Sequence, residues 1–320
     1  MRRREALVLL GSVAAWPLAA RAQQAKRPIV GILLTGNPAP EVFLKSFREA
    51  LRDAGYIESQ NIQLEVRSAE GRAALLPEKA AELVRLKVDV IVTSLTPAAL
   101  AAKQATRDIP IVMAPAGDPV ATGLVASLAR PGGNITGLSA TSAELTGKSL
   151  ELIREVIPSA RRVAVLVNEV DPFSVPFLAQ IGQGGRSLGM EIMPVMTRPS
   201  APLAAAFETM SGLKAEALMV QGSLQNKELF DLAIKYRLPS FSSNQQVARS
   251  GGLMTYSGSV AELHREAVRF VDNILKGRKP ADLPVAQPRR FDLVVNLKTA
   301  QALGIVISPT LLARADLVIE

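Results

Sequence analysis

Short apolar runs alternate with amphipathic segments along most of the chain. The run 88–92 is rich in β-branched side chains, which favour a buried, extended strand. The segment 41–55 instead repeats its apolar residues at helical spacing, so Phe43, Phe47 and Leu51 fall on one face. Strands that alternate with helices in this way predict parallel βαβ units with right-handed crossovers. The pattern therefore predicts an α/β fold.

The alternation forms two successive series. The first runs from about residue 28 to residue 138, and the second starts with a helix expected at 145–158. The second series includes a helix expected at 259–277 and ends with a strand and two short helices. Each series is long enough for a Rossmann-like lobe, and open α/β sheets bind ligands beyond the carboxyl ends of their strands. The sequence thus predicts two lobes with parallel sheets that face each other across a crevice.

The strand expected at 88–92 is followed at once by small polar residues and an alanine-rich helix. Thr96 suits the N-cap of that helix, and Pro97 suits its first position, where the missing N–H is not needed. The amides of a helix N-terminus suit an anion such as a carboxylate. An ordinary βα turn uses the same residue types, so the pattern alone leaves both interpretations open.

Residues 1–22 have the composition of a secretory signal peptide. Arginines at 2–4 precede an apolar stretch at 6–20, and Ala20 and Ala22 form an A-x-A cleavage site. The stretch is too short to span a membrane by itself, and the paired arginines leave a twin-arginine route open. We expect cleavage near Ala22 and a periplasmic mature protein. With no cysteine at the cleavage site, we expect no lipid anchor of the bacterial type.

The composition argues against several kinds of chemistry. The chain has no cysteine, so disulfides, thiol catalysis and sulfur ligands for a metal are excluded. Removal of the signal peptide takes away four arginines and one glutamate, so the net charge falls from +8 to +5. No basic run interleaved with aromatics indicates nucleic-acid binding. His264, the single histidine, lies in mid-helix, and no serine-nucleophile elbow or phosphate-binding Walker loop is present. We expect a monomer with no catalytic residue, metal or cofactor and no nucleic-acid partner.

Three long stretches carry a family resemblance: SFREALRDAGYIESQNIQLEVRSAEG, LTPAALAAKQATRDIPIVMAPAGDPVATGLVASLARPGGNITGLS and FDLVVNLKTAQALGIVISPTLLARADLVIE. With them the sequence resembles the periplasmic solute-binding proteins of ABC transporters, in the family typified by tryptophan-binding lipoproteins. The resemblance implies a type I periplasmic binding fold, with two lobes joined by a three-crossing hinge. It implies a first lobe of residues 27–138 and 258–283 and a second lobe of residues 139–257 and 284–320.

The resemblance also implies that ligand contacts lie on the loops at the carboxyl ends of the strands. In the first lobe the matching residues are Thr35, Gly36, Ser94, Leu95, Thr96, Asp118 and Pro119. In the second lobe they are Asn168, Asp171, Pro172, Ser174, Gln221, Ser223, Ser242 and Asn244. Phe173 is the best aromatic candidate for stacking on a ligand ring. Simpler roles stay open, since Thr96 and Asp118 also suit helix caps, and Asn168 and Ser174 also suit turns.

Two positions depart from the pattern of this family. Val167 stands where relatives often carry an aromatic residue, and Gly117 stands where many carry threonine. Both departures affect the expected ligand more than the fold.

The resemblance implies a binding protein that captures a small solute by lobe closure and delivers it to a membrane permease. The expected ligand is an amino acid or an aromatic acid, because a helix N-terminus suits one carboxylate and the family precedent implies a stacked ring. One alternative is a ligand sensor that presents its closed form to a membrane receptor. An exported hydrolase is a further alternative, which the missing catalytic groups disfavour.

Overall fold

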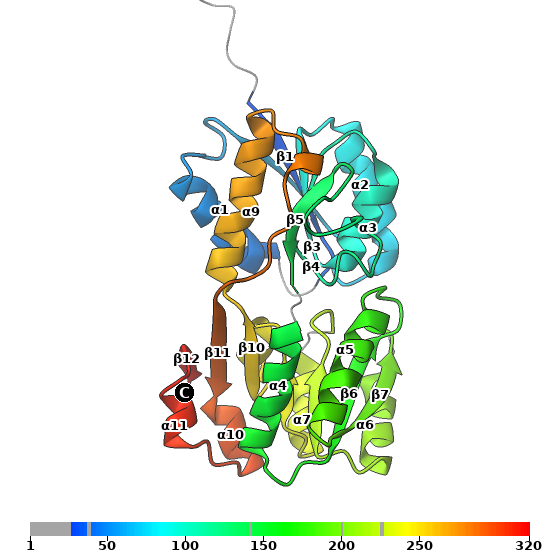
Figure 1. Ribbon diagram of the computed structural model, residues 1–320, viewed down its shortest axis with the longest axis vertical. Coiled ribbons are helices and arrows are strands. Elements are labelled where there is room, and N and C mark those ends of the chain that lie inside the picture. Colours follow the sequence, from blue (N-terminus) through cyan, green and yellow to red (C-terminus); the bar gives the residue numbers. More distant parts are fainter. Residues whose placement is uncertain (1–26, 37–39, 141–142, 200, 225–226) are drawn as a thin grey trace, which may run out of the picture.

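The computed structural model describes residues 27–320 apart from 37–39, 141–142, 200 and 225–226, so the expected signal peptide at 1–22 lies outside the described residues. The chain forms two lobes, each built on its own β-sheet with helices on both faces (Figure 1). The first lobe lies above the second in this view, and the carboxyl ends of the first lobe's strands face the second lobe. This architecture confirms the predicted α/β class with two Rossmann-like lobes.

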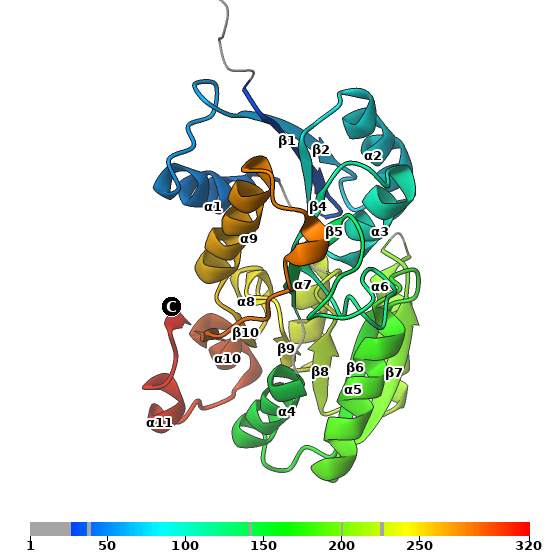
Figure 2. The same cartoon turned by 45° about the horizontal axis from the view of Figure 1, so that its top comes forward.

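The first lobe contains a five-stranded sheet in the order β2-β1-β3-β4-β5, and all neighbours are parallel. Its central strands are apolar on both faces because helices cover both, with α1 and α9 on one side and α2 and α3 on the other (Figure 2). The strands are β1 Ile29–Leu34, β2 Gln63–Ser68, β3 Val90–Ser94, β4 Ile111–Ala116 and β5 Ile135–Ser139. The helices are α1 Pro40–Asp53, α2 Leu76–Arg85, α3 Thr96–Ala105 and α9 Val260–Leu275, with 3-10 turns at Ala73–Leu75 and Pro280–Asp282.

The second lobe contains a seven-stranded sheet in the order β12-β11-β10-β9-β8-β6-β7. Its strands are β6 Arg162–Asn168, β7 Glu191–Thr197, β8 Ala217–Val220, β9 Ser240–Ser242, β10 Met254–Gly258, β11 Phe291–Asn296 and β12 Leu317–Ile319. Its helices are α4 Ala143–Val156, α5 Ser174–Ser187, α6 Leu203–Gly212, α7 Lys227–Lys235, α8 Gln246–Arg249, α10 Leu297–Leu303 and α11 Pro309–Leu312. Residues of α4 and α5 pack on one face of this sheet, and residues of α6 and α7 pack on the other.

The second sheet is not wholly parallel, in contrast to the prediction. Strand β11 runs antiparallel to β10, and β12, which the sequence did not indicate, pairs parallel to β11. The reason is the path of the chain. After β10 the chain crosses to α9 in the first lobe and then returns to the second lobe from the interlobe side. Strand β10 runs toward the first lobe and β11 runs away from it, so the two neighbours are antiparallel.

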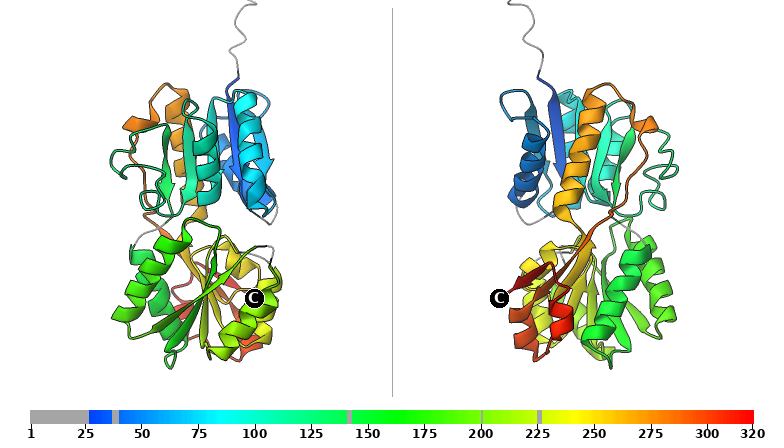
Figure 3. Two further views of the ribbon diagram at one scale, coloured as in Figure 1. Left: turned by 90° about the vertical axis from the view of Figure 1, so that its right-hand side faces the viewer. Right: turned by 60° about the vertical axis from the view of Figure 1, so that its left-hand side comes forward.

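The chain passes between the two lobes after β5, after β10 and before β11, which Figure 3 shows from two sides. Two of these passages pair with each other, because the Ser139 amide donates to the Ala286 carbonyl and the Ala286 amide donates to the Gly137 carbonyl, both at 2.9 Å. Gly137 has a φ of 123°, and a Cβ there would lie 2.4 Å from the Met113 backbone, so only glycine fits. The connection is thus a paired ribbon at the edge of β5.

Candidate functional site

The carboxyl ends of β1, β3 and β4 are hydrogen-bonded to one another in the first lobe. The Thr35 hydroxyl, just after β1, donates to the Ser94 carbonyl at 3.1 Å. The Leu95 amide donates to the Pro115 carbonyl at 2.9 Å, although Leu95 has a φ of 69°, in the left-handed region that side chains disfavour. Strained turns of this kind cluster at ligand-binding segments. These contacts hold the turn before α3 with the first amides of α3 at the interlobe edge.

Thr96 is buried as the first residue of α3, and it does not cap this helix. Its hydroxyl accepts from the Gly117 amide at 3.0 Å and donates to the Gly117 carbonyl at 3.3 Å. The N-cap residue is Leu95, which makes no side-chain capping bond. The prediction of Thr96 as N-cap is therefore wrong, because the pairing of β3 with β4 brings the Gly117 backbone within reach of the hydroxyl. Thr96 instead fixes the loop that follows β4.

The other first-lobe candidates lie on the loops beside this turn. Gly36 is half-buried, and a Cβ on it would meet no atom within 4 Å. Asp118 Oδ1 accepts from the Ala121 amide at 3.0 Å, so this carboxylate caps the turn after β4, as the simpler interpretation expected. Pro119 is buried at the start of that turn.

Four of the second-lobe candidates form one buried hydrogen-bond network. Gln221 Oε1 accepts from the Asn168 amide at 2.7 Å and from the Ser174 hydroxyl at 3.0 Å, and Gln221 Nε2 donates to Asp171 Oδ2 at 3.1 Å. All four residues are at most 5% exposed. Burial raises the pKa of Asp171, while the hydrogen bond from the Phe173 amide to Asp171 Oδ1 acts in the opposite direction. These side chains face each other, so they fix the loop between β6 and α5.

Ser223, Ser242 and Asn244 lie at the ends of β8 and β9. The Ser242 hydroxyl donates to the Val220 carbonyl at 2.9 Å and accepts from the Asn244 amide at 3.3 Å. Asn244 Oδ1 accepts from the Gln246 amide at 3.0 Å. Ser242 is buried, whereas Ser223 and Asn244 are half-buried, and the preceding candidate Pro172 is exposed.

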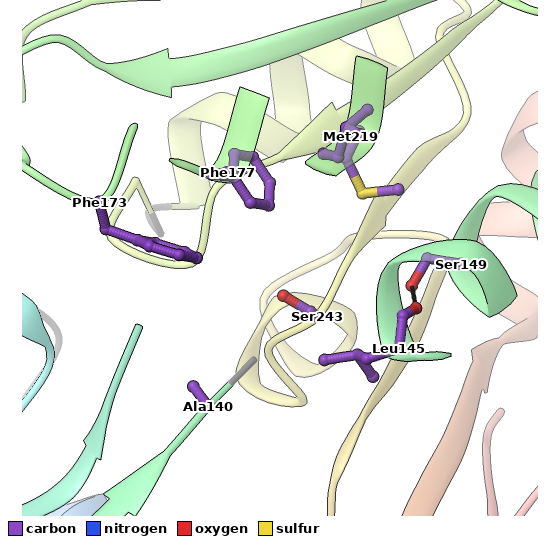
Figure 4. A pocket seen from close by; sticks show the side chains of 8 residues that line it. Ala140, Leu145, Ser149, Phe173, Phe177, Met219 and Ser243 are labelled. Atoms are coloured by element: carbon purple, nitrogen blue, oxygen red, sulfur yellow. Dashed lines mark hydrogen bonds between the residues drawn. The ribbon is translucent and has the colours of Figure 1, made fainter. Parts of the chain in front are cut away.

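A small pocket, partly open to solvent, lies in the second lobe between α4 and α5 (Figure 4). Of the predicted ligand residues only Phe173 lines it. The residues that the sequence did not indicate are Ala140, Leu145, Ser149, Ile181, Met219 and Ser243, together with Phe177, which was noted only as a neighbour. One signal was available, because Phe177 and Ile181 are four residues apart on one face of α5, and Phe173, the N-cap residue, stands four residues before Phe177. The pocket is apolar and aromatic apart from two hydroxyls.

Phe173 connects this pocket to the first lobe. A Cβ on Gly117 would lie 2.6 Å from Phe173 Cγ and 2.7 Å from both Cδ atoms, so the ring rests directly on the Gly117 backbone. In Figure 4 the ring lies at the side of the pocket toward the first lobe. Nearby, Gln180 Nε2 donates to Asp118 Oδ2 at 3.2 Å, again from the second lobe to the first. A chain of contacts therefore runs from the pocket wall at Phe173 through the loop after β4 at Gly117 to the start of α3 at Thr96.

The single histidine lies far from this pocket. His264 Nδ1 is 2.7 Å from the Ser46 hydroxyl, and the Phe43 ring centroid is 4.7 Å from the imidazole, between α1 and α9. Burial lowers the pKa of His264 to about 4, so the imidazole is neutral at physiological pH. Across residues 27–320, the described part of the chain holds no group of three His, Asp or Glu side chains placed to bind a metal ion. The same residues include no helix of the length and apolarity that a membrane span requires.

The architecture is that of type I periplasmic binding proteins, in which a solute binds between two lobes. The chain belongs to the family of ABC transporter substrate binding proteins, whose family model matches residues 32–319. Members of this family bind small molecules outside the cytoplasm and hand them to a membrane permease, so the protein is a solute-binding protein and not an enzyme. The resemblance read from the sequence is thereby confirmed.

Several curated proteins and solved structures are similar to this chain. A tyrosine-binding protein of Clostridioides difficile is 28% identical over 284 residues, which are 87% of this chain and 81% of the relative. A domain of Streptococcus pneumoniae, whose crystal structure contains L-Trp, is 26% identical with a TM-score of 0.84, covering 92% of this chain and 100% of that one. A conserved domain protein of Vibrio cholerae is also 26% identical, with a TM-score of 0.85 and the same coverage.

Proposed function

We propose that the protein is the periplasmic solute-binding component of an importer and that it captures an aromatic amino acid or a similar aromatic carboxylate between its lobes. The observation that carries the proposal is the apolar pocket walled by Phe173 and Phe177, because ligand sites are mostly apolar with a few placed polar groups. The ligands of the two similar proteins from Clostridioides difficile and Streptococcus pneumoniae, tyrosine and L-Trp, support the same class.

The contact chain from the pocket to α3 suggests how the two ends of such a ligand are held. The ligand ring lies in the pocket beside the Phe173 side chain, and Phe173 itself packs against the Gly117 backbone. Thr96 ties Gly117 to the N-terminus of α3, where Ser94, Leu95 and the first helical amides suit a carboxylate. The residues 27–138 with 258–283 and 139–257 with 284–320 then act as two rigid bodies. Contacts that form only when both bodies approach bias the protein toward its closed form.

The roles of the predicted ligand residues differ within this proposal. Phe173 and the turn at 94–96 contact the solute, with Thr35, Gly36 and the segment 118–119 beside them. The buried network of Asn168, Asp171, Ser174 and Gln221 positions Phe173, because its hydrogen bonds are made within the lobe. Ser223, Ser242 and Asn244 position the adjoining strand ends.

Calorimetric titration of the mature protein tests the proposal. L-Trp, L-Tyr, L-Phe and benzoate form the aromatic set, and L-Ala and L-Glu form the control set. We expect saturable heat with members of the aromatic set and none with the controls. A folded, unliganded protein that gives no heat with any aromatic compound contradicts the ligand class. N-terminal sequencing of the periplasmic protein is expected to begin at Gln23, and uptake of the bound solute is expected to fall when the gene is deleted.

A further inference from the structure

Two hydroxyl groups line the otherwise apolar pocket, and they differ in their partners. The Ser149 hydroxyl is buried and donates to the Leu145 carbonyl one turn earlier in α4, at 2.8 Å. Ser243 is half-buried, and no group among the described residues hydrogen-bonds to its hydroxyl. Figure 4 shows the Ser243 oxygen directed into the space between Phe173 and Leu145. Ser243 is therefore the polar group that remains available to a ligand in the pocket.

The neighbours of Ser243 hold it in place. Ser242 before it is anchored to the Val220 carbonyl at 2.9 Å, and β9 lies between β8 and β10 in the sheet. Asn244 after it bonds to Ser242 through its amide and to Gln246 through its side chain. A hydroxyl on so constrained a backbone loses little freedom on binding, which favours its use in recognition.

We propose that Ser243 determines specificity, favouring ligand rings that carry a hydrogen-bonding group over plain phenyl rings. A serine hydroxyl both donates and accepts, so it can pair with a phenol O–H in either direction and can accept from an indole N–H. A phenyl ring fills the same apolar space but removes water from the hydroxyl without replacing the bond, and unpaired polar groups reject such ligands. This inference rests on the proposed aromatic ligand, and it adds the chemical group on the ring that the pocket selects.

The test compares the affinities of L-Tyr, L-Trp and L-Phe by calorimetry in the wild-type protein and in Ser243→Ala. We expect the wild type to prefer L-Tyr or L-Trp over L-Phe by roughly 5- to 10-fold, the value of one neutral hydrogen bond. Ser243→Ala is expected to lose this preference, because L-Phe gains affinity once the unpaired hydroxyl is removed, whereas L-Tyr and L-Trp lose their hydrogen-bond partner. Ser243→Thr retains a hydroxyl and is expected to retain the preference, even where its extra methyl weakens all three ligands.

The matched control is Ser211→Ala, an exposed serine in α6 outside the pocket, which is expected to leave all three affinities unchanged. A preference that survives in Ser243→Ala, or a wild type that binds all three ligands alike, overturns the role of Ser243 but leaves the aromatic ligand class standing. If none of the three ligands binds the folded wild type, the proposed function fails and this inference fails with it.

Discussion

Replacing Gly117 by alanine tests the contact on which the proposed closure depends. The added Cβ lies 2.6 Å from Phe173 Cγ, whereas non-bonded carbons prefer about 3.5–4.0 Å, so a displacement of about 1 Å is required. Rotation of the ring about its own axis does not relieve the contact, because Cγ lies on that axis. The side chain must change its χ1 angle and leave the pocket wall, or the lobes must separate.

The expected cost follows from the same geometry. Overpacking a close contact typically costs about 1–3 kcal/mol. Because this contact joins the two lobes, the substitution destabilises the closed form. This corresponds to roughly 5- to 150-fold weaker binding of the preferred aromatic ligand in calorimetry. Small-angle scattering with saturating ligand is expected to show a larger radius of gyration than in the wild type. Gly133→Ala is the matched control, because its Cβ meets no atom within 4 Å.

A double-mutant cycle separates this steric effect from any other effect of the substitution. In Phe173→Ala the ring is absent, so adding Gly117→Ala is expected to weaken binding by less than about twofold further. If Gly117→Ala costs as much affinity in the Phe173→Ala background as in the wild type, the ring contact is not the cause. The reasoning about closure is then refuted, even though Phe173→Ala itself weakens binding.

Three further outcomes are expected from urea unfolding. Gln221→Leu leaves the buried Asn168 amide without its acceptor and lowers the unfolding free energy by about 2–4 kcal/mol, and an unchanged value refutes the network's role. Thr96→Val leaves the Gly117 amide unpaired and costs about 1–3 kcal/mol, while Thr96→Ser costs less than half of that; equal losses contradict the hydrogen bond. Burial lowers the pKa of His264 from 6.5 to about 4, so the unfolded state takes up the proton at a higher pH than the folded state. The free energy of unfolding therefore falls as the pH is lowered from about 6.5 to about 4. Over this range the wild type is expected to lose about 3 kcal/mol more unfolding free energy than His264→Gln. If the unfolding free energies of the two proteins change in parallel with pH, this role of His264 is excluded.

Local sequence patterns determined most of the secondary structure. The apolar run that became β3 and the helical spacing that became α1 are short-range signals, and they depend little on the rest of the chain. The helix expected at 145–158 is α4, which begins and ends two residues earlier. The direction of β11 had no such signal, because it depends on where the chain re-enters the lobe after α9.

The candidate site shows the limit of sequence reasoning more sharply. Polar residues at strand ends were recognised, but the sequence does not show whether a side chain faces a ligand or another side chain. Asn168 and Gln221 are 53 positions apart and bond to each other, which follows only from the pairing of β6 with β8. The polar residues at that edge therefore serve partly to build the loop behind the pocket.

The sequence by itself determined the α/β class, the two series of elements and the family. Only the tertiary structure decided that Phe173 rests on Gly117 and that Leu145, Met219 and Ser243 enclose one pocket. The physical reason is that periodicity and turn chemistry act between near neighbours, whereas the walls of a pocket come from segments that only packing brings together.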